Sequence, residues 1–176
     1  MDTAALITSF VALFVIIDPI SLTPMFVALT QGLSTSERRS VAIKSCVTSF
    51  AILAIFAFFG HSVLEFVGIS MPAFRIAGGV LLFLTALDML FERRTKRRED
   101  RVEEEEGPDP SVFPLAIPLI AGPGSIATVI LLGGQMGGGL TGSAQVLGVA
   151  LAVLGVVLGL FLAAEYLERA LGPTVI

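Results

Sequence analysis

The sequence is poor in charged residues and in the side chains that usually build redox or metal centres. Only 15% of its 176 residues are charged, and it contains one cysteine and one histidine. A lone Cys46 cannot form a CxxC redox pair, and a lone His61 cannot build a site of several histidines. We therefore predict no metal site and treat Cys46 as a packing residue.

The N-terminus lacks the features of a cleaved signal peptide. It begins with Asp2 rather than a basic segment, and a long apolar stretch follows. The apolar stretches along the chain also lack the two-residue alternation of a membrane barrel. Because backbone groups in lipid must be satisfied internally, we expect permanent membrane helices.

Apolar residues are what the sequence has in abundance. They make up 55% of the chain, and the mean hydropathy is +0.90, far above that of a soluble domain. A membrane-spanning helix needs about 20 apolar residues. Suitable windows run over residues 5–30, 41–66, 74–91, 113–132 and 144–167. The sequence therefore predicts an all-α, polytopic membrane protein.

The positions of the basic residues predict how these helices are oriented. When the five helices alternate across the bilayer, every lysine and arginine except Arg75 falls on one side, including the cluster at 93–101. The positive-inside rule assigns that side to the cytoplasm. The N-terminus is then outside, and the charged linker 92–110 is a solvated cytoplasmic hinge, for which we predict no nucleic-acid partner.

An internal repeat relates the two parts of the chain. Residues 18–21 align with residues 122–125, so that proline matches proline and serine matches serine. Because three helices precede the linker, the second copy enters from the opposite side, as in many secondary transporters. The same offset carries the counterpart of the third helix beyond Ile176. We expect repeats at 1–91 and 111–176, with five helices of an expected six.

Prolines interrupt the first helix of each repeat. Pro19 and Pro24 remove backbone donors from one helix, and Pro114, Pro118 and Pro123 do so in the other. Broken helices at membrane depth are tolerated where the freed groups are buried in protein or line a wet cavity, and such groups can bind a zwitterion. A simple packing kink is the alternative.

Polar and small residues near these breaks are the candidate substrate ligands. Asp18 either caps the half-helix that begins at Pro19 or carries a coupled proton or cation. Arg75 either snorkels to the interface or pairs with Asp18 or a substrate carboxylate. Hydroxyls such as that of Ser125 can instead bond back to their own helix. The full set is Asp18, Pro19, Ser21, Thr23, Pro24, Arg75, Gly78, Gly122, Pro123, Gly124 and Ser125.

Three segments also resemble a known family. LFVIIDPISLTPMFVAL at 13–29, MPAFRIAGGVLLFLTALDML at 71–90 and FPLAIPLIAGPGSIATVILL at 113–132 are similar to the MarC family, also called UPF0056 or SnatA-like, within the LysE-type exporter group. The resemblance spans residues 5–176. It implies two inverted three-helix repeats, a bacterial inner-membrane location and transport of small neutral amino acids such as glycine or alanine. The chain departs from the family by ending before a sixth helix.

The leading hypothesis is a secondary transporter or exporter of small neutral amino acids that alternates access around a midplane site and needs no cofactor. Proton or sodium coupling and homo-oligomerisation are left open. An alternative is a non-transporting membrane scaffold, for which Gly148, Gly155 and Gly159 would allow close helix contacts. An intramembrane serine protease is disfavoured because His61 and Ser125 map to different depths, so we predict no enzyme activity.

Overall fold

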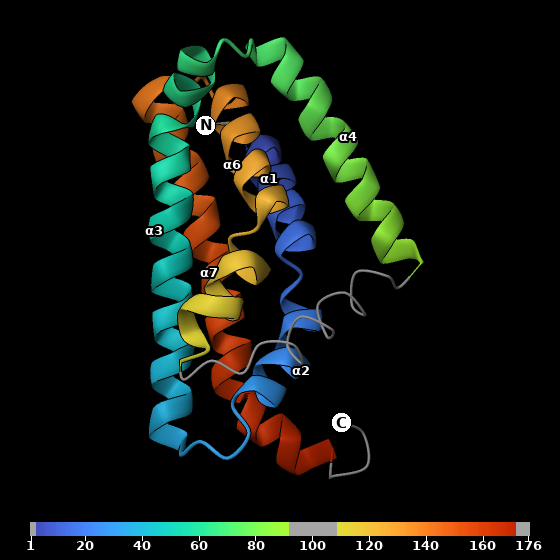
Figure 1. Ribbon diagram of the computed structural model, residues 1–176, viewed down its shortest axis with the longest axis vertical. Coiled ribbons are helices and arrows are strands. Elements are labelled where there is room, and N and C mark those ends of the chain that lie inside the picture. The colour runs from blue at the N-terminus through green and yellow to red at the C-terminus, as the bar shows by residue number, and fades with distance from the viewer. Residues whose placement is uncertain (1–2, 92–108, 172–176) are drawn as a thin grey trace.

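The computed structural model describes residues 3–91 and 109–171, with side chains as far as residue 164. These ranges fold into seven helical segments and contain no strand (Figure 1). In chain order they are α1 Thr3–Ile17, α2 Pro19–Leu29, α3 Thr35–Val67, α4 Met71–Leu90, η1 Ser111–Ile120, α6 Pro123–Gln135 and α7 Gly139–Leu171.

The helices confirm the predicted all-α membrane fold. Four spans are long and apolar enough to cross a bilayer, and α1 with α2 forms one of them. η1 and α6 make a fifth when their bent pair, at 55°, is counted as one broken span. α3 starts earlier than the apolar pattern predicts, because Ser34 and Glu37 form a capping box that stabilises a polar first turn.

The helix boundaries repeat at the offset found in the sequence. α2 and α6 each begin with a proline, Pro19 and Pro123, and α3 and α7 each contain 33 residues, starting at Thr35 and Gly139. α3 runs upward and α7 downward in Figure 1, so the two copies are inverted. The division at 1–91, 92–110 and 111–176 stays a prediction, since most of the linker lies outside the described residues.

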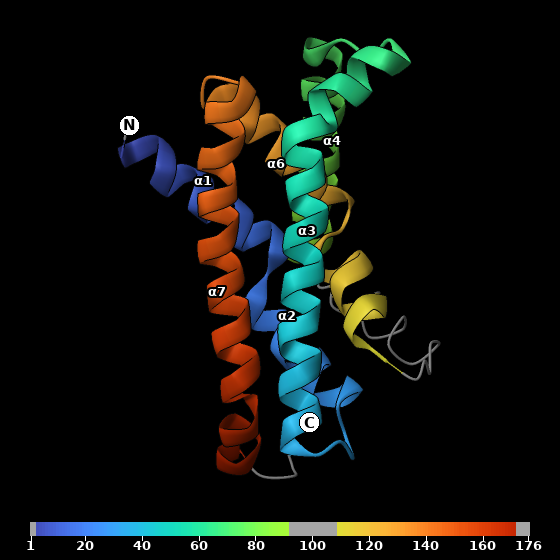
Figure 2. The ribbon, with the colours of Figure 1, turned by 90° about the vertical axis from the view of Figure 1, so that its left-hand side faces the viewer.

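The core forms where the two long helices pack along each other. α3 also contacts η1 and α6, while α7 contacts α1 and α2, so each long helix holds the broken helix of the other copy (Figure 2). The rings of Phe26 and Phe161 stack at 4.2 Å between α2 and α7. Cys46 is buried, with its Sγ 4.0 Å from the carbonyl oxygen of Leu154.

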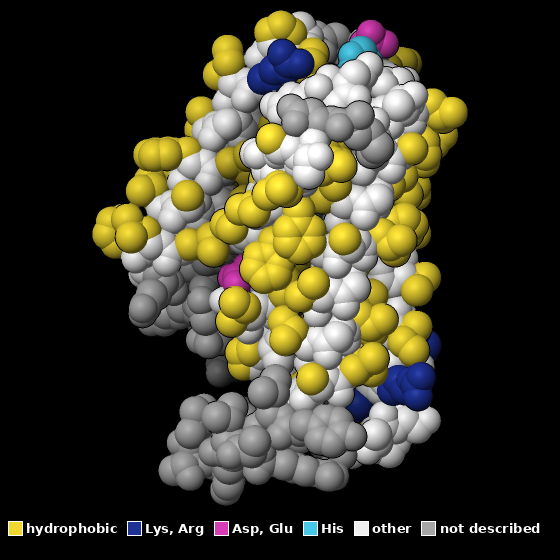
Figure 3. All heavy atoms as spheres, turned by 180° about the vertical axis from the view of Figure 1, so that it is seen from behind, with side chains coloured by type: hydrophobic (Ala, Val, Ile, Leu, Met, Phe, Trp, Pro, Cys, Tyr) yellow, Lys and Arg dark blue, Asp and Glu magenta, His cyan; other side chains and the backbone are white. Residues whose placement is uncertain are grey.

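α4 stands apart from this core. Gly78 is its one buried residue, and the helix packs mainly on α6, from which it diverges toward its C-terminal end (Figure 1). Much of the molecular surface carries exposed apolar side chains, as Figure 3 shows for one face. A helix that is apolar all round suits contact with lipid.

Most of the described charged side chains lie near the two ends, and Asp18 is an exception. We call the end at which α2 passes into α3 the lower end, and the end at which α3 passes into α4 the upper end, as drawn in Figure 1. At the lower end Arg38 donates to the carbonyl of Thr30 at 3.1 Å, and Lys44 pairs with Asp109 at 3.2 Å. Hydrogen bonds from Ser111 and Lys44 lower the pKa of the Asp109 carboxyl.

Candidate functional site

The first break consists of a single residue, Asp18. Its φ of 59° and ψ of 66° are left-handed, the only positive φ at a non-glycine residue in the described ranges. Its carboxylate accepts a hydrogen bond from the amide of Ser21 at 3.3 Å, so Asp18 caps α2 while Pro19 occupies the first helical turn. Aspartate tolerates this conformation better than most residues, and proline needs no donor at that position.

The second break is longer and has no side-chain cap. η1 is irregular at Phe113 and Ile117, each of which precedes a proline, and α6 begins at Pro123 after the N-cap residue Gly122. A Cβ at Gly122 would lie 2.4 Å from the carbonyl oxygen of Pro118, so only glycine fits here. The first amides of α6 are therefore left without the side-chain acceptor that Asp18 provides to α2.

The two breaks meet in the middle of the bundle. α1 packs against α6, and a Cβ built on Gly124 would lie 3.3 Å from Cγ2 of Ile16, two residues before Asp18. Figures 1 and 2 both place the two breaks at about half the height of the molecule. The structure thus brings the aspartate of one repeat close to the uncapped helix start of the other.

Hydroxyl groups near both breaks bond back to their own segments. Thr23 donates to the carbonyl of Pro19 at 2.8 Å, and Ser125 donates to that of Ile120 at 2.8 Å. Thr128 does the same with Gly124 at 2.7 Å. Because each donor is already used, these side chains brace the breaks and offer a ligand only their acceptor lone pairs.

Arg75 and Gly78 lie away from the breaks. Gly78 faces α6, where an added Cβ would come within 2.9 Å of the Leu131 side chain, so its role is to let the two helices pack. Arg75 is exposed near the upper end of α4. No ion pair joins Arg75 to Asp18, so the structure supports neither a salt bridge nor a common ligand for these two residues.

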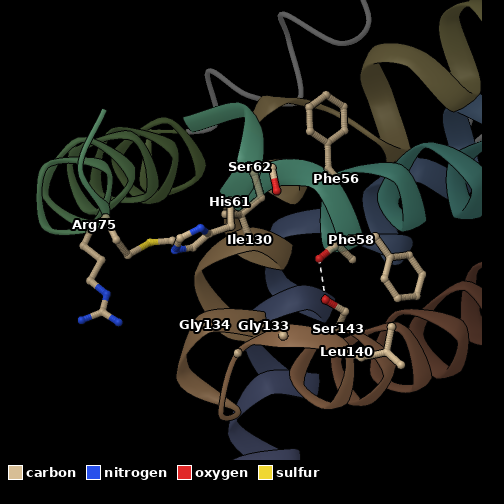
Figure 4. Close-up of a pocket in the computed structure, with 14 residues that line it drawn as sticks. Phe56, Phe58, His61, Ser62, Arg75, Ile130, Gly133, Gly134, Leu140 and Ser143 are labelled. Atoms are coloured by element: carbon tan, nitrogen blue, oxygen red, sulfur yellow. Dashed lines mark hydrogen bonds between the residues drawn. The ribbon is translucent and has the colours of Figure 1, made fainter. Parts of the chain in front are cut away.

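Arg75 instead lines a cavity of about 450 Å³ at the upper end, between α3, α4, α6 and α7 (Figure 4). His61 of α3 also lines it and pairs with Glu65 at 3.5 Å. Across the cavity, Ser143 of α7 donates to the carbonyl of Ala57 of α3 at 2.6 Å. This cavity does not reach Asp18 or Gly122.

The glycines around this cavity were not among the residues selected from the sequence. Gly133 lines the cavity, and its carbonyl oxygen lies against Gly142, where there is no room for a Cβ. Gly137, Gly138 and Gly139 all have positive φ and form the turn between α6 and α7. The segment 133–145 stands out in the sequence because it is rich in glycine and has no charge. The sequence does not reveal which helices it contacts.

The described residues contain no group of three histidine, cysteine, aspartate or glutamate side chains placed to hold a metal ion. The arrangement is one of helix ends, backbone groups and a few isolated charges. Such groups can bind a small polar ligand, as the helix breaks of many membrane transporters do.

Known proteins resemble the chain over most of its length. A model of the MarC family integral membrane protein matches residues 3–176. The UPF0056 membrane protein YvbG of Bacillus subtilis is 36% identical over 169 residues, which cover 94% of this chain and 80% of that protein.

Two relatives from Methanocaldococcus jannaschii are longer than the region they share with this chain. The UPF0056 membrane protein MJ0972 is 43% identical over 129 residues, and MJ1677 is 41% identical over 134 residues. The matches cover 72% and 74% of this chain but only 57% and 65% of those relatives. No solved structure matches. By its sequence and its helical architecture, the chain belongs to the MarC family of integral membrane proteins.

Proposed function

We propose that this protein is a secondary transporter of small neutral amino acids, such as glycine or alanine, and that the paired breaks form its midplane site. The observation that carries the proposal is the contact between two broken helices that belong to oppositely directed repeats. A packing kink explains one bent helix. It does not explain why the two copies each break at the same position and why the breaks meet.

The two breaks offer complementary groups to a zwitterion. The uncapped amides at the start of α6 and the positive end of its dipole suit a carboxylate. Asp18, in the other repeat, supplies negative charge for an ammonium group. A ligand bound between them would touch both repeats, so its affinity would change when the repeats move relative to each other.

Access to this site requires the repeats to move. Gly124 packs closely on Ile16, so a ligand can enter between the breaks only if α1 and α6 separate. We propose that the repeats rock about the seam between α3 and α7, opening the breaks to one side and then to the other. By the positive-inside rule we propose that the lower end faces the cytoplasm. The family resemblance leads us to propose a bacterial inner membrane.

Flux through purified protein tests this proposal. The full-length protein is reconstituted into lipid vesicles, and entry of radiolabelled glycine or alanine is compared with entry into protein-free vesicles. We expect faster, saturable uptake that slows in the Asp18→Ala variant, with the distant surface variant Arg39→Gln as control. Uptake equal to that of empty vesicles would refute the proposal.

A scaffold without transport activity is a second candidate, and one observation favours it. A Cβ on Gly148, Gly155 or Gly159 of α7 would meet nothing within 4 Å, so α7 presents a row of small residues to its surroundings. Such rows suit close contact with another helix. The same flux experiment separates the two functions, because a scaffold would give no saturable uptake.

A further inference from the structure

The cavity at the upper end is a second place where a small ligand could bind, separate from the paired breaks. Its volume of about 450 Å³ falls within the range of about 300 to 1,000 Å³ that is usual for small-molecule sites. Phe56 and Leu140 are among its apolar walls, and part of its lining is glycine. It is therefore a concave site in which apolar walls stand beside the polar side chains of His61, Ser62, Arg75 and Ser143.

Arg75 brings a positive charge to the cavity. Among the described residues that line it, Arg75 and His61 are the ionisable ones, and none is an aspartate or glutamate. The guanidinium of Arg75 forms no ion pair or hydrogen bond with the described part of the chain. A planar guanidinium can hold a carboxylate with two parallel hydrogen bonds.

Glycines leave the cavity open beside Arg75. Gly134 lies on the last turn of α6, and a Cβ there would meet no atom within 4 Å. Arg75 extends from α4 on one side, and Leu140 and Ser143 lie on the α7 side (Figure 4). The empty space next to Gly134 can therefore accept a ligand that Arg75 holds from the other wall.

We propose that this cavity binds the carboxylate of a small amino acid at the mouth of the protein, with Arg75 as its anchor. The inference rests on the proposed function only for the choice of glycine and alanine as ligands. It predicts that the amino acid binds in this cavity without Asp18, and that it binds whether or not the protein transports it.

Binding to purified protein in discs of neutral phospholipid tests the inference. The titration uses the Asp18→Asn protein, which keeps the cap of α2 but lacks the negative group of the midplane site. Labelled alanine is titrated in the presence of propionate, which keeps the carboxylate, or ethylamine, which keeps only the amine. Propionate should compete and ethylamine should not. Arg75→Gln should weaken binding by about tenfold to a hundredfold, the effect of losing a charged hydrogen-bonded pair.

Two pairs of variants control for folding. Gly134→Leu fills the cavity and should abolish the binding that depends on Arg75, whereas Gly79→Leu makes the same change at an exposed position of α4, where a Cβ also meets nothing within 4 Å. Arg39→Gln removes an exposed arginine from the lower end and should leave the affinity unchanged. Unchanged affinity in both Arg75→Gln and Gly134→Leu would overturn the proposal.

The phosphate of an anionic lipid could use the same guanidinium. The titration is therefore repeated in discs that contain phosphatidylglycerol. Alanine that still binds, with the same dependence on Arg75, supports the amino-acid site. No alanine binding in neutral discs, together with phosphatidylglycerol binding that Arg75→Gln abolishes, would assign the cavity to lipid and overturn the proposal. If alanine binds here but does not cross the vesicle membrane, the transport proposal fails and the cavity proposal stands.

Discussion

At the residue scale, Asp18 forms the helix cap, which is one of the two roles that the sequence left open for it. It caps α2 through the amide of Ser21, and its left-handed φ places the break at a single residue. The Asp-Pro pair made the cap predictable, because aspartate is a strong N-cap and proline favours the first helical turn. Whether its charge also serves a substrate or a coupled ion depends on the neighbouring repeat, which local sequence does not encode.

Two substitutions separate the cap of Asp18 from its charge. Asparagine caps helices as well as aspartate and tolerates the left-handed region, so Asp18→Asn should change stability little. Asp18→Ala loses both properties and should cost about 1 to 3 kcal/mol. Thermal unfolding in detergent measures this difference. If Asp18→Asn destabilised the protein as much as Asp18→Ala, the capping account would be wrong.

The charge of Asp18 has its own readout. In vesicles, Asp18→Asn should reduce uptake of glycine or alanine even though the fold is intact, because the negative group that faces the ligand is gone. If Asp18 carries a coupled proton, the variant should also lose its response to a pH gradient. Unchanged uptake would restrict Asp18 to its structural role.

At the scale of elements, the sequence predicted the positions of the helices better than the contacts between them. Five apolar windows and two proline-rich breaks were visible in the chain, and the structure confirms helices in those regions. The position of Arg75 was not predictable in the same way. Apolar side chains lie around most of α4, so its pattern does not indicate which side contacts α6.

The contact of α4 with the bundle depends on one glycine. Gly78→Leu should force the Leu131 side chain aside and loosen α4, since an added Cβ already lies 2.9 Å from Leu131. Overpacking of this kind typically costs about 1 to 3 kcal/mol. Hydrogen exchange along α4 should rise in this variant.

Gly79 provides a matched control on the same helix. A Cβ there meets nothing within 4 Å, so Gly79→Leu should leave hydrogen exchange and thermal stability close to those of the unchanged protein. Equal effects of the two variants would show that leucine disturbs α4 itself rather than its contact with α6.

At the scale of the whole molecule, the inverted repeat explains the arrangement of the elements. Each long helix packs on the broken helix of the opposite copy, and the breaks therefore meet in the middle. The offset of the Pro-containing motifs made the repeat predictable from sequence. The irregularity of η1 was also predictable, since Phe113 and Ile117 each precede a proline, but its packing against α3 was not.

The most direct test of the account links the two breaks covalently. Ile16→Cys and Gly124→Cys, with Cys46 replaced by alanine, place two thiols where a Cβ on Gly124 lies 3.3 Å from the Ile16 side chain. Each single-cysteine variant serves as a control. Flux of glycine or alanine is then measured in vesicles before oxidation, after oxidation and after reduction.

Oxidation should form the disulfide in the double variant alone. If the breaks must separate for substrate to pass, flux should then stop in that variant, and reduction should restore the flux. Undiminished flux with the disulfide formed, as established by mass spectrometry, would contradict the account.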